Sequence, residues 1–301
     1  MRIISLISSA TEIVHSLGCA EMLVGISHEC DYPNYIKNLP ICSQPRLNPD
    51  GSSIEIDNQV RSILQDALSI YRINQDLISK LNPDVIITQS QCQVCAVNLN
   101  DVQRALKDML DIDPQIISLE PKSLDDVWSD IKKIAKKLKK DKVALSMLEN
   151  INGEITSIKE RKKDKNKRTV ACIEWIDPLM FAGNWVPEMV DIVDGVDLFG
   201  IKGEHSSWSK KHILFEKDPD IIIFMPCGYD IAKTRQEVIK IFGLDEWKNL
   251  KSFNSGNVYI TDGNQYFNRP GPRLLDSIKI LDEIINQSNS FEYFGHGWIG
   301  L

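Results

Sequence analysis

The sequence predicts an α/β protein with two Rossmann-like lobes, each built on a parallel sheet, joined by one long helix. Short apolar runs alternate with amphipathic stretches of helical period, which is the order of β-α-β units. In residues 81–87 and again in 217–223 a helix ends before a proline and a strand follows at once. Between these segments, residues 123–151 contain neither proline nor glycine, so a stiff helix is expected there.

These observations divide the chain into three parts. The expected parts are an N-terminal lobe of residues 1–122, a linking helix of residues 123–150 and a C-terminal lobe of residues 151–301. The linking helix carries one apolar face from Leu124 to Leu138, and its helical character should continue to about residue 162.

In the N-terminal lobe the apolar residues 3–7 predict the first strand. A helix follows in which Ser9 and Glu12 have the spacing of a capping box, and it should end at Gly18. Ser52 and Glu55 have the same spacing at the start of a second helix. Further strands are expected at residues 23–26, 85–88 and 115–119, and further helices around residues 77–81 and from residue 100.

In the C-terminal lobe Pro187 should open a helix that ends at Gly195, and a closing helix should begin at Pro272. The strands of this lobe are expected at residues 168–173, 196–199, 221–225 and 257–261.

The composition is that of an ordinary soluble protein, with 43% hydrophobic and 26% charged residues. A net charge of −7 argues against nucleic-acid binding, and the basic residues of 132–142 and 159–168 are interpreted as solvated helix faces. No apolar run approaches the roughly 18–20 residues of a membrane span. Residues 1–7 lead directly into a strand without the pattern of a secretory signal, and seven cysteines, an odd number, favour reduced thiols. We therefore expect a cytoplasmic protein.

Ligands of open α/β sheets bind beyond the carboxyl ends of the strands, and that rule selects the candidate residues. Trp175 and Trp185 flank an apolar loop that would suit a flat hydrophobic ligand, or that would simply pack. Arg269 and Arg273 flank a Pro-Gly-Pro turn and could hold a phosphate or carboxylate, or form surface ion pairs. The complete set of candidate ligand-binding residues is Ser9, Thr11, His28, Gln91, Glu174, Trp175, Trp185, His205, Tyr266, Arg269 and Arg273.

Cys92 and Cys95 form a CxxC motif, whose spacing suits zinc or redox chemistry. A full metal site would need two more ligands, and the alternative is that reduced cysteines pack or line a pocket. His28 could bind a metal or cofactor, or could hold its own loop by hydrogen bonds. The candidate metal ligands are Cys30, Cys92, Cys95 and Cys227. No P-loop, GxGxxG, GxSxG or HExxH motif occurs, so no catalytic residue is assigned and the question of an enzyme stays open.

Several of these segments resemble the substrate-binding proteins of vitamin B12 and iron-siderophore ABC importers, and the cobalamin-binding branch most of all. The resemblance rests on residues 2–6, 9–13, 17–18, 23–25, 28–33, 81–86 and 218–222. It implies two lobes linked by one long helix, with the ligand between them. Such proteins commonly dock on a permease through one acidic residue on each lobe. Asp76 matches the first position, but the second falls near His212, which puts permease docking in doubt.

The residues and the resemblance together lead to one main hypothesis. The chain is expected to be a cytosolic, non-catalytic protein that binds cobalamin or a related corrinoid in the cleft between its lobes. Aromatic side chains would contact the flat face of the ligand, the two arginines its polar groups, and His28 or a cysteine its metal. The alternatives are a protein, possibly an enzyme, that binds zinc, iron or an iron–sulfur cluster through its cysteines, and the substrate-binding component of a cobalamin or siderophore importer.

Overall fold

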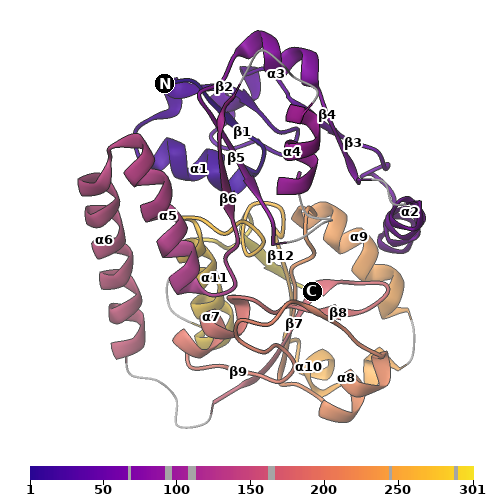
Figure 1. Ribbon diagram of the computed structural model, residues 1–301. Helices are drawn as coiled ribbons and strands as arrows, with labels where there is room; N and C mark the ends of the chain where they lie inside the picture. Colours follow the sequence, from indigo (N-terminus) through magenta and orange to yellow (C-terminus); the bar gives the residue numbers. More distant parts are fainter. Residues whose placement is uncertain (67–68, 92–96, 108–112, 162–166, 244–245, 288–290) are drawn as a thin grey trace. The chain divides into compact units, whose positions relative to one another are not determined.

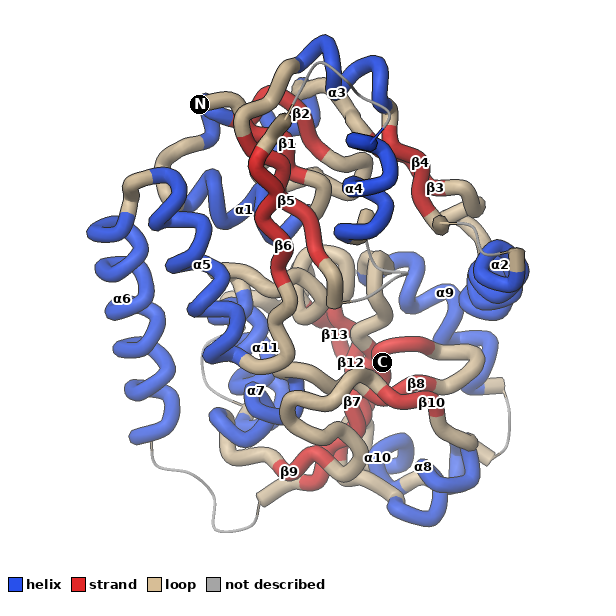
Figure 2. The backbone as a smooth tube through the Cα atoms, viewed as in Figure 1, coloured by secondary structure: helices blue, strands red, loops and turns tan. Residues whose placement is uncertain are grey.

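The computed structural model describes all residues except 67–68, 92–96, 108–112, 162–166, 244–245 and 288–290 (Figure 1). The chain forms two compact units, each a mixture of helices and strands (Figure 2). Unit 1 contains residues 1–121 and 125–148, and unit 2 contains residues 122–124 and 149–301. The predicted α/β class is confirmed. No helix in the described part of the chain is long and apolar enough to cross a membrane.

The sheet of unit 1 has the order β2-β1-β5-β6, and all neighbouring strands are parallel. Its strands are β1 (Ile3–Ser5), β2 (Leu23–Ile26), β5 (Val85–Gln89) and β6 (Gln115–Leu119). They are short and almost wholly apolar in the middle of the sheet, as expected of strands covered on both faces. A separate antiparallel pair consists of β3 (Ser43–Pro45) and β4 (Tyr71–Ile73).

The helices of unit 1 test the two predicted capping boxes. One of them is confirmed, because the Ser52 hydroxyl accepts from the Glu55 backbone N–H and the Glu55 carboxylate accepts from the Ser52 backbone N–H. The other is wrong: a helix capped by Ser9 would begin at Ala10, but the first helix begins two residues earlier, at Ser8, and has no side-chain cap. The helices are α1 (Ser8–Ser16), α2 (Ser53–Gln65), α3 (Gln75–Leu81) and α4 (Leu99–Lys107), with short 3-10 turns at Ala20–Met22 and Asn34–Asn38.

The stretch expected to form one long linking helix is instead two helices, α5 (Leu124–Leu138) and α6 (Asp141–Glu160). Lys139 between them has a left-handed backbone with φ of 56°, and the Lys140 N–H donates to the Ala135 carbonyl oxygen. That bond closes the end of α5 as a left-handed cap does. The division between the two units falls inside α6, between Leu148 and Glu149.

The sheet of unit 2 has the order β10-β8-β7-β11-β12-β13, and β9 also pairs with β7. Its parallel strands are β7 (Thr169–Trp175), β9 (Val196–Asp197), β11 (Ile221–Phe224) and β12 (Val258–Thr261). The antiparallel strands are β8 (Met180–Phe181), β10 (Ser207–Trp208) and β13 (Trp298–Gly300). The helices are α7 (Val186–Ile192), α8 (Lys211–Lys217), α9 (Ile231–Phe242), α10 (Lys251–Asn254) and α11 (Leu274–Asn286), with a 3-10 turn at Trp247–Asn249.

The motif that occurs twice in the sequence has the same local structure in both units. α3 ends at Asn82 with φ of 43°, and α8 ends at Asp218 with φ of 42°. Asn and Asp are the non-glycine residues that tolerate this left-handed conformation best. Two residues later a carboxylate fixes the start of the neighbouring strand: Asp84 accepts from the Arg2 N–H at 2.7 Å, and Asp220 accepts from the Thr169 N–H at 2.7 Å. Each motif therefore ends a helix and aligns two strands.

Replacing Asp220 with asparagine should lower stability at neutral pH by about 1 kcal/mol. Partial burial raises the pKa of Asp220, but hydrogen bonds from Lys251 and Thr169 outweigh it and hold that pKa at about 2. A depressed carboxyl pKa adds stability above the ordinary value near pH 4, and this contribution disappears as the pH falls toward 2. Thermal unfolding of Asp220→Asn at pH 7 and pH 2 checks this. The same change at Asp84, whose side chain is 61% exposed, should have a smaller effect.

Candidate functional site

Unit 2 gathers aromatic and polar side chains at the carboxyl ends of β7 and β11. Trp175 ends β7, and its ring lies 5.3 Å from the ring of Tyr229, which follows β11. The Cys227 N–H donates to the Glu174 carbonyl oxygen at 3.3 Å, so the loop after β11 is fastened to the end of β7. Lys233 in α9 places its Nζ 4.0 Å above the Tyr229 ring. Parallel strands thus bring these side chains to one edge of the sheet, as the strand-end rule predicts.

Trp175 has one property that bears on ligand binding. Its side chain is only partly exposed, and its Nε1 is a buried donor without a hydrogen-bond partner in the described part of the structure. Leaving such a group unpaired costs about 1–3 kcal/mol. An acceptor supplied by a ligand would remove that cost.

Glu174 is held in place by a chain of hydrogen bonds that begins at a glycine. The Ser206 hydroxyl donates to a Glu174 carboxylate oxygen at 2.9 Å and accepts from the Gly183 N–H at 3.1 Å. A Cβ on Gly183 would lie 2.4 Å from the Glu204 carbonyl oxygen, so only glycine allows the two segments to come this close. His205 is exposed beside them, and its Nδ1 lies 3.0 Å from the Ser206 carbonyl oxygen.

Trp185 is placed differently from Trp175. It is 5% exposed, and its Nε1–H donates to the Phe267 carbonyl oxygen at 2.7 Å. Its ring is therefore buried within unit 2, and its N–H is satisfied by a carbonyl of the same unit.

The loop before α11 holds the three remaining candidates of unit 2. Tyr266 is buried, and the guanidinium of Arg273 lies 5.6 Å from the centre of its ring. Arg273 also donates to the Gln265 side chain at 3.4 Å. Arg269 is 5% exposed and donates to the Asn264 side chain at 3.0 Å. Arg273 is thus the more accessible of the two guanidinium groups.

In unit 1 His28 lies between two side chains of the β3-β4 pair. Its Nδ1 is 3.0 Å from the Ser43 hydroxyl of β3, and its ring is 5.2 Å from the ring of Tyr71 in β4. Its Nε2 lies 3.9 Å from a carboxylate oxygen of Glu29. Burial lowers the pKa of His28 to about 4, so its imidazole is neutral at pH 7.

Ser9, Thr11 and Cys30 are buried in unit 1. The Thr11 hydroxyl donates to Ser5 at 2.8 Å and lies 3.1 Å from the Cys30 sulfur. Burial raises the pKa of Cys30 to about 11, which keeps the thiol protonated at neutral pH. The Ser9 Oγ is buried without a partner in the described structure. Gln91 is half-buried and is the last described residue before position 92.

Of the candidate metal ligands, Cys92 and Cys95 lie outside the described residues. Within those residues, no group of three His, Cys, Asp or Glu side chains is arranged to hold a metal ion. Cys30 belongs to unit 1 and Cys227 to unit 2. Zinc, iron or iron–sulfur binding therefore stays a prediction, which metal analysis of the purified protein would test.

Four partners of the candidate residues were not singled out from the sequence: Ser43, Tyr71, Ser206 and Tyr229. Ser43 and Tyr71 contact His28 from far along the chain, and Ser206 contacts Glu174 from a distance of 32 residues. Ser206 and Tyr229 had a usable signal, because they lie in loops that follow the predicted strands at residues 196–199 and 221–225.

Comparison with known proteins identifies the family. Residues 3–265 match the family model described as periplasmic binding protein. A substrate-binding lipoprotein of an ABC transporter from Bacillus subtilis is 19% identical over 290 residues, which cover 94% of this chain and 79% of that protein.

Solved structures share the fold of this chain at low sequence identity. A possible iron-binding periplasmic solute-binding protein from Staphylococcus epidermidis has a TM-score of 0.72 and 22% identity, covering 94% of this chain and 98% of its own. The periplasmic vitamin B12-binding protein of Vibrio cholerae has a TM-score of 0.66 and 19% identity, covering 94% of this chain and 96% of its own. A periplasmic heme-binding protein from Roseiflexus has a TM-score of 0.69 and 19% identity, covering 95% of this chain and 98% of its own.

These matches correct two expectations. The family is periplasmic and the curated relative is a lipoprotein of an ABC transporter, so both work outside the cytoplasm. The expected cytoplasmic location is therefore wrong, and so is the expected function as a cytosolic holder of a corrinoid. The amino-terminal residues had favoured that location because they resemble a core strand, which they are. The chain belongs to the periplasmic binding protein family.

Proposed function

We propose that this chain is the substrate-binding component of an ABC importer and works outside the cytoplasm. The observation that carries the proposal is the family match over residues 3–265, which includes the parallel strands of both sheets. The lipoprotein relative, itself named as a substrate-binding component, supports the same role.

The proposed cargo is a metal-containing tetrapyrrole, with cobalamin or a related corrinoid first and heme second. Proteins named for vitamin B12 and for heme share this fold, and unit 2 offers suitable side chains at its strand ends. Trp175, packed against Tyr229, presents a ring for a flat apolar ligand and an unpaired N–H for one of its acceptors. Arg273 could pair with a phosphate or carboxylate of the cargo.

His28 is proposed as a ligand of the metal in that cargo. Neutral imidazole is the form that binds metals, and burial keeps His28 neutral at pH 7. The contact of Nδ1 with Ser43 orients the ring, as outer partners of metal-binding histidines do.

The earlier doubt about permease docking is replaced by a proposal that the chain docks, with Asp76 as one contact. Asp76 and His212 are the second residues of α3 and α8, the two helices that end in the repeated motif. Both side chains are exposed. Docking through one acidic residue instead of two should depend strongly on that residue.

Asp76→Lys should therefore reduce transport at least tenfold while leaving cargo affinity unchanged. A lysine reverses the charge presented to the permease. A permease surface that attracts the carboxylate of Asp76 would repel a lysine at the same position. Transport by vesicles containing the permease, measured beside cargo binding to the same variant, tests this. Lys80→Glu at the other end of α3 is the control. Normal transport by Asp76→Lys would exclude a docking role for this residue.

Titration of the purified protein with cyanocobalamin, and separately with hemin, tests the proposed cargo. We expect one ligand to bind at a 1:1 ratio with an absorbance change and a calorimetric signal. Binding of a ferric siderophore with no signal from either tetrapyrrole would reject the proposed cargo and leave the importer role. Substituting His28→Gln should alter the absorbance of the bound ligand more than its affinity.

A further inference from the structure

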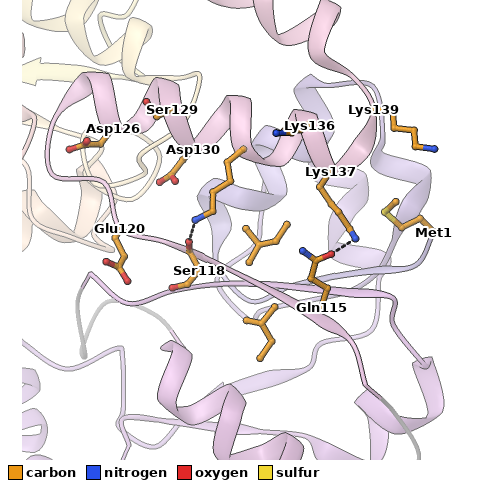
Figure 3. A pocket seen from close by; sticks show the side chains of 13 residues that line it. Met1, Gln115, Ser118, Glu120, Asp126, Ser129, Asp130, Lys136, Lys137 and Lys139 are labelled. Atoms are coloured by element: carbon orange, nitrogen blue, oxygen red, sulfur yellow. Dashed lines mark hydrogen bonds between the residues drawn. The ribbon is translucent and has the colours of Figure 1, made fainter.

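A groove on unit 1 lies apart from the strand-end residues discussed so far. It has a volume of about 920 Å³ and lies between β6 and the helix α5 (Figure 3). None of the candidate ligand or metal residues lines it. Its lysines belong to residues 132–142, whose pattern of charges had predicted a solvated helix face.

One wall of the groove is the edge of a sheet. β6 is the last strand in the order β2-β1-β5-β6, and it pairs only with β5 in the described sheet. The ammonium group of Lys133 donates to the Ser118 carbonyl oxygen at 2.5 Å, and Lys137 donates to the Gln115 side chain. Lysines commonly protect an exposed edge in this way. Here Lys133 occupies a main-chain acceptor of β6 that an added strand would use, whereas Lys137 contacts only a side chain.

The charges in the groove are separated along its length. Glu120, Asp126 and Asp130 lie toward one end, and Lys136, Lys137 and Lys139 toward the other (Figure 3). Asp130 and Lys137 are seven residues apart on α5, which corresponds to about 10 Å along the helix. A ligand complementary to the groove carries a positive group and a negative group at a similar separation.

Asp130 supplies an independent indication of a ligand. It lines the groove, it is 9% exposed, and its Oδ2 is buried without a hydrogen-bond partner in the described structure. Burial raises the pKa of Asp130 to about 6, although Lys133 nearby lowers it. A carboxylate in this position is stabilised by a donor that carries a positive charge.

We propose that this groove binds an extended peptide segment of a partner protein, which pairs with β6 as an added strand. A Lys or Arg side chain of that segment meets Asp130, and an acidic side chain meets Lys136 and Lys137. Strand addition takes its affinity from main-chain hydrogen bonds and its specificity from alternate side chains. A small zwitterion would satisfy the charges but would not pair with the main chain of β6, so the peptide accounts for more of the observations.

The test uses fluorescent pentapeptides that carry the two charges four positions apart, on one side of the strand and about 13 Å from each other. The probes are blocked Glu-Val-Thr-Val-Lys and Lys-Val-Thr-Val-Glu, one for each direction along β6, and the neutral control is Gln-Val-Thr-Val-Gln. We expect one charged probe to bind the full chain at micromolar concentration and the neutral one at least tenfold more weakly.

Variants on α5 connect the binding to the groove. Asp130→Asn should weaken binding of the preferred probe at least tenfold. The double substitution Lys136→Gln and Lys137→Gln should weaken it by a similar factor. Asp125→Asn and Lys132→Gln, on the same helix but outside the groove lining, should leave it unchanged. Affinity should also fall between pH 7.5 and pH 5 as Asp130 becomes protonated among Glu120, Asp126 and Lys133, and this fall should be absent in Asp130→Asn.

Three results would overturn the proposal. They are the absence of binding by both charged probes at 1 mM, equal loss of binding in the Asp125→Asn control, and equally tight binding of the free dipeptide Lys-Glu, which would indicate a site for small zwitterions. The cargo titrations test residues outside the groove and are carried out on separate samples. Failure of the peptide proposal is therefore distinguishable from failure of the importer proposal.

Discussion

Replacing Trp175 with alanine should weaken binding of the cargo, cobalamin or hemin, at least thirtyfold. A buried tryptophan at the centre of a contact commonly contributes about 2 kcal/mol or more, which corresponds to that factor. The substitution removes both the ring packed against Tyr229 and the unpaired Nε1–H. Isothermal titration of the purified variant measures the effect.

Two other tryptophans of unit 2 provide matched controls. Trp208 in β10 is 54% exposed, so Trp208→Ala should leave both affinity and stability nearly unchanged. Trp185→Phe loses the bond to the Phe267 carbonyl oxygen and should reduce stability more than affinity. Unchanged affinity in Trp175→Ala would remove this residue from the proposed site.

Replacing Glu283 with alanine should cost about 3 kcal/mol of stability and lower the melting temperature by roughly 6–12 °C. Glu283 in α11 is 2% exposed. Its carboxylate accepts from the Trp298 Nε1–H at 2.6 Å and from the Tyr293 N–H at 3.2 Å. The substitution leaves both donors buried and unpaired, and it loosens the attachment of β13 to β12.

Thermal unfolding followed by circular dichroism measures this loss. Glu283→Gln keeps one acceptor oxygen and should lose less stability than Glu283→Ala. The exposed neighbour Glu292 is the control, and Glu292→Ala should shift the melting temperature by less than about 2 °C. A Glu283→Ala protein as stable as the control would mean that the carboxylate does not anchor the carboxyl-terminal strand.

The sequence predicted the elements whose signals are local. The prolines at positions 83 and 219 marked two helix ends and two strand starts, and the Ser52–Glu55 spacing marked a cap. The break at Lys139 could not be predicted, because a lysine carries no signal for a left-handed turn. The Ser9–Glu12 spacing misled because the helix begins before Ser9 and buries both side chains.

The candidate site was less predictable, because its geometry depends on residues that are distant in sequence. Trp175 and Trp185 look alike in the sequence, yet only Trp185 has its donor satisfied, by a carbonyl 82 residues away. The chemistry of Cys30 depends on burial, which its loop position does not reveal. The groove between α5 and β6 had a partial signal in Asp126, Asp130, Lys133 and Lys137, whose spacings of three and four residues place them along one face of a helix.

Uptake of labelled cobalamin and of labelled hemin by cells that lack this chain tests the central proposal most directly. We predict that uptake of one of the two is lost, that it returns when the chain is restored, and that the Trp175→Ala variant does not restore it. Unchanged uptake of both compounds in the deletion strain would contradict the account.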